Sequence, residues 1–541
     1  MPFQDNKVFD AVLICLLFII SFGYFQYGYR YFDLGTYHYD EGIVAYGAVR
    51  ILDGAIPYKD FWTLYAPGEF YLLAIIFKIF GISLKVTRLF AVTILALTVC
   101  SIYLLIKKLC SRTFAVLAFL LSLFWLKSYM VYNRPGQLAM LFFILCSFSL
   151  INFINSGRNK WLIITGILSG IIGFFRQDFG FYIFTSIFLI ILLKQLNYYR
   201  DRKCKERIRL ILKNELSLFF GSIIVLLPVF IYLFVNSAFK EFINDTVVFP
   251  ITIYPKVRDL PFPGLKVENL IFYLPLFVFF LTSIRLLFYN WRVKVEDNIL
   301  WLALFFLFSG LGLFNYTNVR ACMTHLLPTM IPAIILFILL FYNFLKNLTR
   351  KVKYFYKSFI WVTSSLMCFI LLFYLTKPSF LIHAKYPSFI PEIQKKDGFI
   401  NINRAQGFYD DSGLAKSLTL AIQYIQDNTG QDEKIFVGNL RHDKVVNSDV
   451  MFYFLSQRHS ATKYYELHPG LTNTQKIQKA IISDLIKARV RYIVLWSGSK
   501  LKEDEPNESG KSSGVSDLDN FIQKNYKIEK DFSAYLILSH I

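Results

Sequence analysis

The sequence predicts an α-helical polytopic membrane protein with about eleven transmembrane helices, followed by a C-terminal extracytoplasmic α/β domain. The first observation is composition, because 55% of the 541 residues are hydrophobic and 18% are aromatic. The mean hydropathy of +0.46 is too high for an ordinary soluble protein of this length. The second observation is a series of apolar runs before residue 376, and the third is a change to alternating polar and apolar segments after residue 400.

Each predicted span is an apolar run near the length of about 20 residues that a bilayer requires. The spans are residues 8–27, 86–106, 112–127, 136–154, 160–176, 178–194, 216–235, 270–289, 299–314, 326–345 and 359–376. The first run has no small-residue cleavage site, so we expect it to be retained. Residues 65–81 are ambiguous, because their apolar core is short and contains Pro67, Gly68, Glu69 and Lys78.

The positions of the basic residues indicate whether residues 65–81 span the membrane. If residues 65–81 lie at the interface without spanning, and the N-terminus is cytoplasmic, the basic loops all face the cytoplasm, as membrane topology favours. These loops contain Lys107, Lys108 and Arg112, Arg158 and Lys160, residues 194–213, Arg292 and Lys294, and residues 346–357. The net charge of +21 therefore reflects topology and not a nucleic-acid partner. We expect a multi-pass protein of the plasma (inner) membrane.

The predicted domains are a transmembrane domain over residues 1–376, a linker over 377–407 and the α/β domain over 408–541. The transmembrane domain includes an outer loop at residues 28–85. In the C-terminal domain the pattern predicts helices and strands in alternation, at 415–427, 433–437, 473–487, 490–496 and 517–525, before a final pair of strands. Residues 498–516 are rich in Ser, Gly and Glu and predict a disordered loop.

Two adjacent carboxylates, Asp40 and Glu41, follow the first span in the stretch YHYDEG. A carboxylate near the membrane boundary, with cations close by, can serve as a base toward an attacking hydroxyl or amine. The plain alternative is an acidic start to the helix predicted at residues 41–52, which the helix dipole favours. Local spacing alone favours this alternative.

Further charged residues stand at the outer ends of distant spans, where a charge is costly unless it is paired or faces water. They are Arg134, Arg176, Asp178, Arg320 and His325. Several arginines beside carboxylates suit a phosphate-bearing ligand. Each one alone is equally well explained by snorkelling to the headgroups. The cysteine and histidine spacing predicts no metal site. In the C-terminal domain, Glu466, His468 and their neighbours are candidates for an acceptor site, although turns and caps are the commoner role.

The order of several short motifs resembles the GT-C superfamily of membrane glycosyltransferases. It is similar to the dolichyl-phosphate-mannose protein mannosyltransferases, the lipid A aminoarabinose transferases and the Rgt-type lipopolysaccharide sugar transferases. The resemblance covers roughly residues 8–345. The motifs are Asp40-Glu41, residues 54–61 (GAIPYKDF), residues 65–68 (YAPG), residues 80–83 (FGIS) and Arg88-Leu89.

This resemblance implies transfer of a hexosyl or pentosyl unit from a polyprenyl-phosphate donor to a glycan, lipid or protein acceptor outside the cytoplasm. It implies inversion at the sugar, with membrane lipids as surroundings. Asp40 matches the catalytic base, with Glu41 assisting it. No cofactor is required, although a divalent cation is possible. The remaining substrate-binding candidates include the holders of the donor phosphate; they are Tyr39, Lys59, Tyr65, Arg134, Arg176, Asp178, Arg320 and His325.

The chain departs from the family at Gly136, which follows Arg134-Pro135 in a turn where relatives often carry an acidic residue. Three alternative functions stay open. A flippase or transporter of lipid-linked sugars would place charges at the middle of the bilayer. A non-catalytic scaffold that displays the C-terminal domain would tolerate loss of Asp40. An O-antigen ligase or polymerase would have a large outer loop between late spans.

Overall fold

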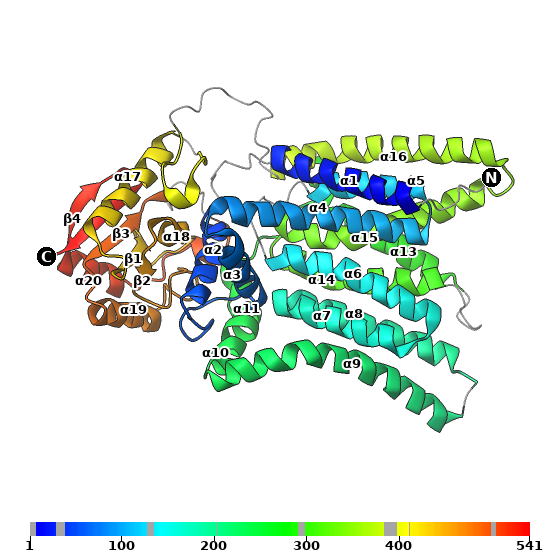
Figure 1. Ribbon diagram of the computed structural model, residues 1–541, viewed down its shortest axis with the longest axis horizontal. Coiled ribbons are helices and arrows are strands. Elements are labelled where there is room, and N and C mark those ends of the chain that lie inside the picture. The colour runs from blue at the N-terminus through cyan, green and yellow to red at the C-terminus, as the bar shows by residue number, and fades with distance from the viewer. Residues whose placement is uncertain are drawn as a thin grey trace.

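The computed structural model describes residues 7–28, 38–126, 135–201, 203–289, 298–383, 398–409, 412–498 and 505–541. It consists of a bundle of long helices and a smaller α/β domain that lies at one end of that bundle (Figure 1). We call this end the domain end and the opposite end the far end. The N-terminal helix starts at the far end, whereas the C-terminus lies in the α/β domain (Figure 1).

The bundle confirms the predicted membrane fold. Within the described residues, nine helices are long and apolar enough to cross a membrane, and two shorter apolar helices accompany them. Together they coincide with the eleven predicted runs. The helices are α1 (Lys7–Gly28), α4 (Leu84–Leu109), α5 (Arg112–Leu126), α6 (Pro135–Ser156), α7 (Asn159–Phe175), α8 (Gln177–Tyr198), α9 (Cys204–Val235), α13 (Leu270–Leu287), α14 (Asn298–Val319), α15 (Met323–Leu348) and α16 (Tyr354–His383).

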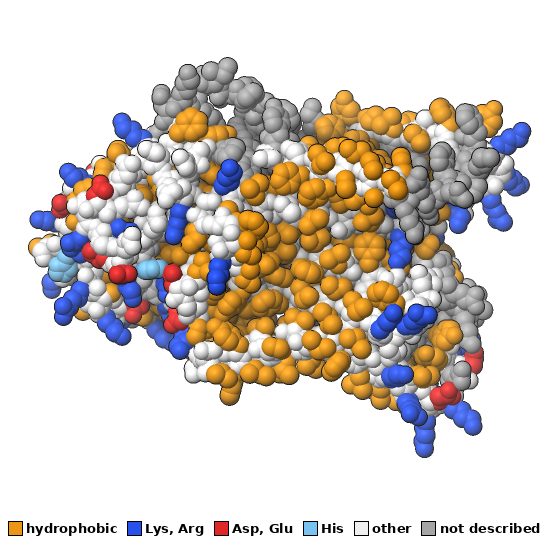
Figure 2. Space-filling model, viewed as in Figure 1, with side chains coloured by type: hydrophobic (Ala, Val, Ile, Leu, Met, Phe, Trp, Pro, Cys, Tyr) orange, Lys and Arg blue, Asp and Glu red, His pale blue; other side chains and the backbone are white. Residues whose placement is uncertain are grey.

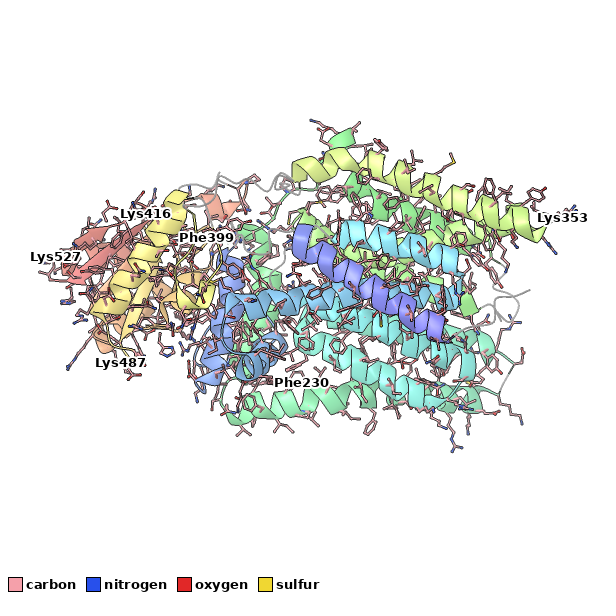
Figure 3. The ribbon with its side chains drawn as sticks, turned by 45° about the horizontal axis from the view of Figure 1, so that its top comes forward. Phe230, Lys353, Phe399, Lys416, Lys487 and Lys527 are labelled. Carbon is pink, nitrogen blue, oxygen red and sulfur yellow. The ribbon has the colours of Figure 1, made fainter. Side chains whose placement is uncertain are left out.

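The surface of the bundle has the charge distribution of a membrane protein. Hydrophobic side chains cover its visible face, and Lys and Arg side chains gather at the far end (Figure 2). Lys353 lies at that end, whereas Lys416, Lys487 and Lys527 lie on the α/β domain (Figure 3). An apolar belt between two charged ends is the surface that a bilayer requires.

Two helices that do not span the bundle lie between it and the α/β domain (Figure 1). They are α2 (His38–Leu52) and α3 (Gly68–Phe80). The ambiguous segment at residues 65–81 thus contains a helix of 13 residues, which at about 1.5 Å per residue is too short to cross a bilayer. The loop at residues 236–269, for which no elements were predicted, forms the short helices α10 (Phe239–Ile243), η1 (Asn244–Val248), α11 (Phe249–Thr252), α12 (Tyr254–Val257) and η2 (Val267–Asn269).

The C-terminal domain contains a mixed five-stranded sheet in the order β2-β1-β3-β5-β4. The central strands β1 and β3 are parallel, and β5 pairs antiparallel with β3 and β4. The strands are β1 (Lys434–Asn439), β2 (His459–Ser460), β3 (Tyr492–Trp496), β4 (Tyr526–Asp531) and β5 (Tyr535–His540). The helices are η4 (Asn403–Ala405), α17 (Ser412–Asn428), α18 (Met451–Ser456), α19 (Gln475–Lys487), η6 (Glu508–Gly510) and α20 (Asp517–Asn525). Thus η4, α18, β2 and η6 are additions to the predicted elements.

The structure differs from the prediction of a disordered loop at residues 498–516. Residues 505–516 contain η6, and Asn507 donates a hydrogen bond of 2.8 Å to the carbonyl of Asp259 in the transmembrane domain. Ser513 likewise donates its backbone N–H to the carbonyl of Asp443. Composition predicts disorder because such a segment buries little apolar surface, but polar partners supplied by distant parts of the chain order it. Residues 499–504 lie outside the described residues.

The α/β domain shares one hydrophobic core with α2 and α3. Side chains of α2 and α3, including Tyr46 and Phe70, pack in a single cluster with side chains of α17, α18 and the sheet. The Tyr46 ring stacks on Tyr453 at 5.2 Å between ring centroids, and its hydroxyl accepts a hydrogen bond of 2.7 Å from the Ser460 backbone N–H. The C-terminal domain is therefore packed against α2 and α3 rather than only tethered by the chain.

Within the bundle, α7 and α9 approach each other through glycines. A Cβ atom on Gly221 would lie 2.2 Å from the carbonyl oxygen of Ile163, and one on Gly166 would lie 2.2 Å from that of Leu218. Small residues at such positions let membrane helices pack closely.

We expect Gly221→Leu to lower the thermal stability of the purified protein in detergent, because the larger side chain must push α7 and α9 apart. Overpacking of this kind costs about 1–3 kcal/mol. The matched control is Gly23→Leu in α1, where a Cβ would meet no atom within 4 Å. Equal melting temperatures for the two variants would contradict the close α7–α9 contact.

Candidate functional site

Asp40 lies in the first turn of α2, half-buried at the junction between the bundle and the C-terminal domain. Its carboxylate is close enough to Tyr65 and Glu466 for the charges to interact. The N-terminal end of a helix favours a negative charge, because the unpaired N–H groups there give it a partial positive charge. The acidic first turn of α2 therefore also places Asp40 at this junction.

Glu41, predicted to assist catalysis, instead forms a buried ion pair. Arg88 of α4 donates from Nε to Oε1 of Glu41 at 3.1 Å and from Nη2 to Oε2 at 2.8 Å. The Glu41 side chain is fully buried and that of Arg88 is 4% exposed. The Arg88 guanidinium also lies over the ring of Phe408 in the C-terminal domain, at 4.9 Å. Successive helix residues point about 100° apart, so Glu41 faces α4 and holds α2 in place.

Tyr65 lies beside Asp40 in a loop that α8 holds. Gln177 at the start of α8 donates from Nε2 to the carbonyl of Leu64 at 2.9 Å and accepts from the N–H of Ala66 at 3.1 Å. Burial raises the pKa of the Tyr65 phenol well above its usual value, and the charges of Asp40 and Glu466 raise it further. Tyr65 is therefore a neutral hydroxyl group next to Asp40.

Arg176 joins Tyr65 to a second group of predicted residues. It donates from Nε and Nη2 to the two carboxylate oxygens of Asp178 at 2.7 and 3.1 Å. Its guanidinium lies 5.7 Å from the ring centre of Tyr65 and 4.7 Å from that of Tyr316. His325 also belongs to this group, because its ring stacks on that of Tyr316 with 4.1 Å between the ring centroids. The structure thus brings four predicted residues together around Tyr316.

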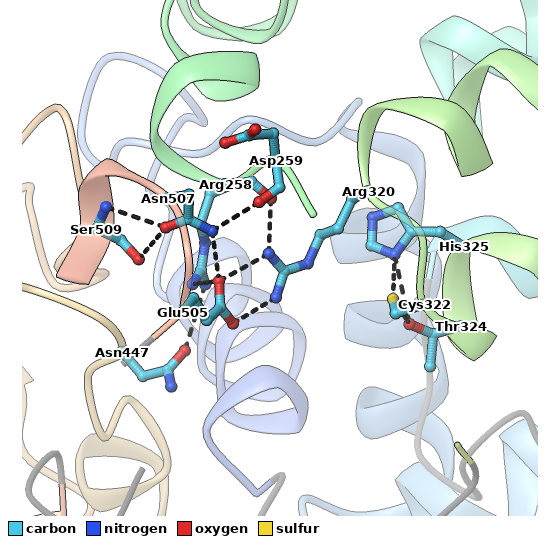
Figure 4. Close-up of polar contacts among 10 residues, drawn as sticks. All are labelled: Arg258, Asp259, Arg320, Cys322, Thr324, His325, Asn447, Glu505, Asn507 and Ser509. Carbon is cyan, nitrogen blue, oxygen red and sulfur yellow. Dashed lines mark hydrogen bonds and ion pairs between the residues drawn. The ribbon is translucent and has the colours of Figure 1, made fainter. Parts of the chain in front are cut away.

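Arg320 is bound by a carboxylate of the C-terminal domain (Figure 4). Its Nη1 and Nη2 atoms donate to Oε2 and Oε1 of Glu505 at 2.8 and 2.6 Å, and Nη1 also donates to the carbonyl of Arg258 at 2.6 Å. The Arg258 guanidinium lies 3.6 Å from Oε2 of Glu505. Although burial alone would raise the pKa of Glu505, the hydrogen bonds and charges of the two arginines lower it to about 2. Glu505 is therefore an anion shared between two arginines.

Three arginines, Arg320, Arg258 and Arg176, lie close enough to Tyr254 for their charges to act on its phenol. Burial raises the pKa of the Tyr254 phenol, and the charges of Arg320, Arg258 and Arg176 oppose that rise. All three guanidinium groups are thus near one hydroxyl. A group of arginines at a buried boundary provides many fixed N–H donors, and phosphate is the anion that matches their geometry best.

The other predicted site residues are placed elsewhere or lie outside the described side chains. Lys59 is exposed in the tight turn before Phe61. The backbone of Tyr39 belongs to α2, but its side chain is outside the described residues, as is all of Arg134. Within the described residues, no group of three or more His, Cys, Asp or Glu side chains is arranged to hold a metal ion.

Several residues of this site were not predicted as such. Arg258, Tyr254 and Glu505 belong to segments without a recognisable motif, although Arg258 had the same signal as Arg320, a charge beside the end of an apolar segment. Glu466 was considered as an acceptor-site candidate, but a turn or cap was the favoured role. Each of these residues approaches the site through a contact that joins segments remote in sequence, which local spacing does not reveal.

Residues 65–206 match the family model described as dolichyl-phosphate-mannose-protein mannosyltransferase. No curated protein sequence matches the chain.

Two solved membrane proteins share its fold. An oligosaccharyltransferase from Archaeoglobus fulgidus, tethered with an acceptor peptide, is 12% identical with a TM-score of 0.55, over 97% of this chain and 72% of that one. ArnT from Cupriavidus metallidurans in the apo state is 13% identical with a TM-score of 0.52, over 99% of both chains. The same ArnT bound to undecaprenyl phosphate is 11% identical, with a TM-score of 0.50 over 98% of both chains. At this identity the likeness establishes the fold alone.

The buried pair of Glu41 and Arg88 gives a test of the structural role. We expect Glu41→Gln to lower the free energy of unfolding by about 3–5 kcal/mol, because it leaves Arg88 buried without a counter-charge. The double variant with Arg88→Gln should recover much of this loss. The measurement is thermal unfolding in detergent.

The control for this pair is Asp10→Asn, which removes a partly exposed ion pair with Lys107 at the far end and should cost less than about 1 kcal/mol. Wild-type stability of Glu41→Gln would show that Glu41 does not hold α2.

Proposed function

We propose that this protein, whose fold is that of the GT-C membrane glycosyltransferases, transfers a sugar from a polyprenyl-phosphate donor to an acceptor. The observation that carries the proposal is the position of Asp40. It is half-buried at the end of a membrane bundle, in the same junction as the three arginines. A base beside an anion-binding group at the membrane boundary is what a lipid-borne donor requires.

In the proposed reaction Asp40 accepts a proton from the acceptor hydroxyl or amine. The freed electron pair forms a bond to the anomeric carbon of the donor, and the bond from that carbon to the phosphate oxygen breaks. Polyprenyl phosphate leaves with that electron pair, and its negative charge is stabilised by Arg320, Arg258 and Arg176. A single displacement of this kind inverts the anomeric centre.

Lipid solubility explains the location of the site. A prenyl chain stays in the bilayer while its phosphate and sugar reach the domain end of the bundle. Tyr65 is well placed to bind the sugar or the acceptor beside Asp40. The ArnT structure bound to undecaprenyl phosphate and the oligosaccharyltransferase tethered with an acceptor peptide support these two substrate classes. The sugar is a hexosyl or pentosyl unit.

The charge distribution supports an orientation. The basic residues at the far end of the bundle (Figure 2) favour the cytoplasm. The protein then lies in the plasma (inner) membrane with its N-terminus inside, and the site and the C-terminal domain are outside.

We expect Asp40→Asn to lower sugar transfer by about 10²–10⁴-fold, because the amide cannot accept the acceptor's proton. The measurement is transfer of radiolabel from a panel of polyprenyl-phosphate sugars in membranes, with and without a metal chelator. The control is Asp53→Asn, an exposed carboxylate just after α2. Equal transfer by wild type and Asp40→Asn would show that Asp40 is not the base, and would favour the flippase or scaffold functions.

The contact of Glu505 with Arg320 predicts competition with the donor. A phosphate that binds Arg320 and Arg258 must displace this carboxylate, so we expect Glu505→Gln to lower the donor KM about three- to tenfold. Glu508→Gln is the control, because Glu508 is exposed and pairs with Lys511. A raised donor KM in Glu505→Gln would instead mean that the carboxylate holds Arg320 in its binding position.

A further inference from the structure

The C-terminal domain contributes a second buried carboxyl group to the junction. Glu466 follows β2 in the segment from Tyr464 to Gly470, and its side chain is 6% exposed. Its Oε2 atom has no hydrogen-bond partner among the described residues. Buried polar atoms are nearly always hydrogen-bonded, because the loss of water is otherwise uncompensated. An oxygen without a partner, buried beside a candidate base, therefore requires an explanation.

The segment that contains Glu466 is fixed on both sides. Before it, the N–H of Trp62 donates to the carbonyl of Lys463 at 3.0 Å. After it, the ring of His468 packs against Trp62 at 5.5 Å and against Phe249 at 5.1 Å. At Gly470, a Cβ would lie 2.6 Å from the Ile253 side chain. Glu466 is therefore held in place against the loop before α3 and the short helices at residues 239–257.

The charged and titratable groups that face Glu466 are few. Asp40 of α2 interacts with it across the junction, and Arg258 approaches it after α12. The phenols of Tyr65 and of its neighbour Tyr465 interact with it as well. Burial raises the pKa of both phenols, so these two groups stay neutral.

We propose that Glu466 is an acceptor-binding residue, which uses its unpartnered carboxyl group to hold the acceptor's polar group beside Asp40. This inference rests on the proposed function and extends it, because the C-terminal domain then forms part of the reaction centre. The acceptor's hydroxyl or amine lies between two carboxyl groups. One of them accepts its proton, and the other donates a hydrogen bond to it.

Glu466 keeps its proton for a physical reason. Burial and the charge of Asp40 together raise the pKa of Glu466 to about 8, although the charge of Arg258 opposes them. Two adjacent carboxylates repel each other, so one of the pair keeps its proton. Glu466 is thus a neutral acid at pH 7, able to donate a hydrogen bond through its hydroxyl. Above about pH 8 Glu466 loses its proton, and with it the donor.

The test uses the full-length protein in proteoliposomes with the donor and acceptor identified by the radiolabel assay. The variants are Glu466→Gln, Glu466→Ala and, as control, Glu529→Gln, which changes an exposed residue of β4. The KM for each substrate is measured at pH 7, and kcat is measured from pH 6 to 10.

The proposal predicts that Glu466→Ala raises the acceptor KM about tenfold, a typical effect of removing one hydrogen bond to a polar substrate. The donor KM stays unchanged. Glu466→Gln keeps a donor N–H, so it retains activity at pH 7 and does not lose activity above pH 8 as the wild type does. A merely structural carboxyl group would not give this change in the pH profile.

Three results would overturn the proposal. They are an unchanged acceptor KM in Glu466→Ala, a raised donor KM, and a Glu466→Gln pH profile identical to that of the wild type. If Glu466→Ala does not fold, the pH profile of Glu466→Gln decides alone. If Asp40→Asn abolishes transfer but the Glu466 variants leave it unchanged, only this inference is rejected. No transfer by the wild type would reject the proposed function as well.

Discussion

The packing of α2 between the bundle and the C-terminal domain is the constraint on which the rest of the structure depends. Three consecutive residues perform three separate tasks. Asp40 faces the junction, Glu41 pairs with Arg88 of α4, and Gly42 lies against α18, where a Cβ would be 2.4 Å from the backbone nitrogen of Met451. Because successive helix residues point about 100° apart, no one of these contacts can shift without moving the others.

The C-terminal domain is consequently a component of the site. It shares a hydrophobic core with α2 and α3, and the segments that contain Glu466 and Glu505 bring carboxyl groups to the arginines of the bundle. A domain that packs through a continuous core keeps its loops in register with the bundle. Groups from the two parts can then be held as precisely as groups within one domain.

The arginines of the site are already matched with carboxylates. Arg176 pairs with Asp178 and Arg320 with Glu505. A buried guanidinium without a partner would be costly, so these carboxylates stabilise the protein in the absence of an anionic ligand. Under the proposed function, binding of the donor phosphate at Arg320 would therefore exchange one anion for another. The affinity depends on the difference between the two interactions and not on the charge of the arginines alone.

The sequence by itself determined the membrane fold, the predicted spans, the non-spanning segment at residues 65–81 and most of the C-terminal elements, because these follow from local periodicity and charge. It also indicated that Asp40, Arg176 and Arg320 stand near one end of the bundle. Only the tertiary structure decided that Glu41 is buried against Arg88, that residues 505–516 are ordered and that Glu466 faces Asp40. Each of these depends on contacts between segments remote in sequence, where burial and a partner's charge decide the role of a residue.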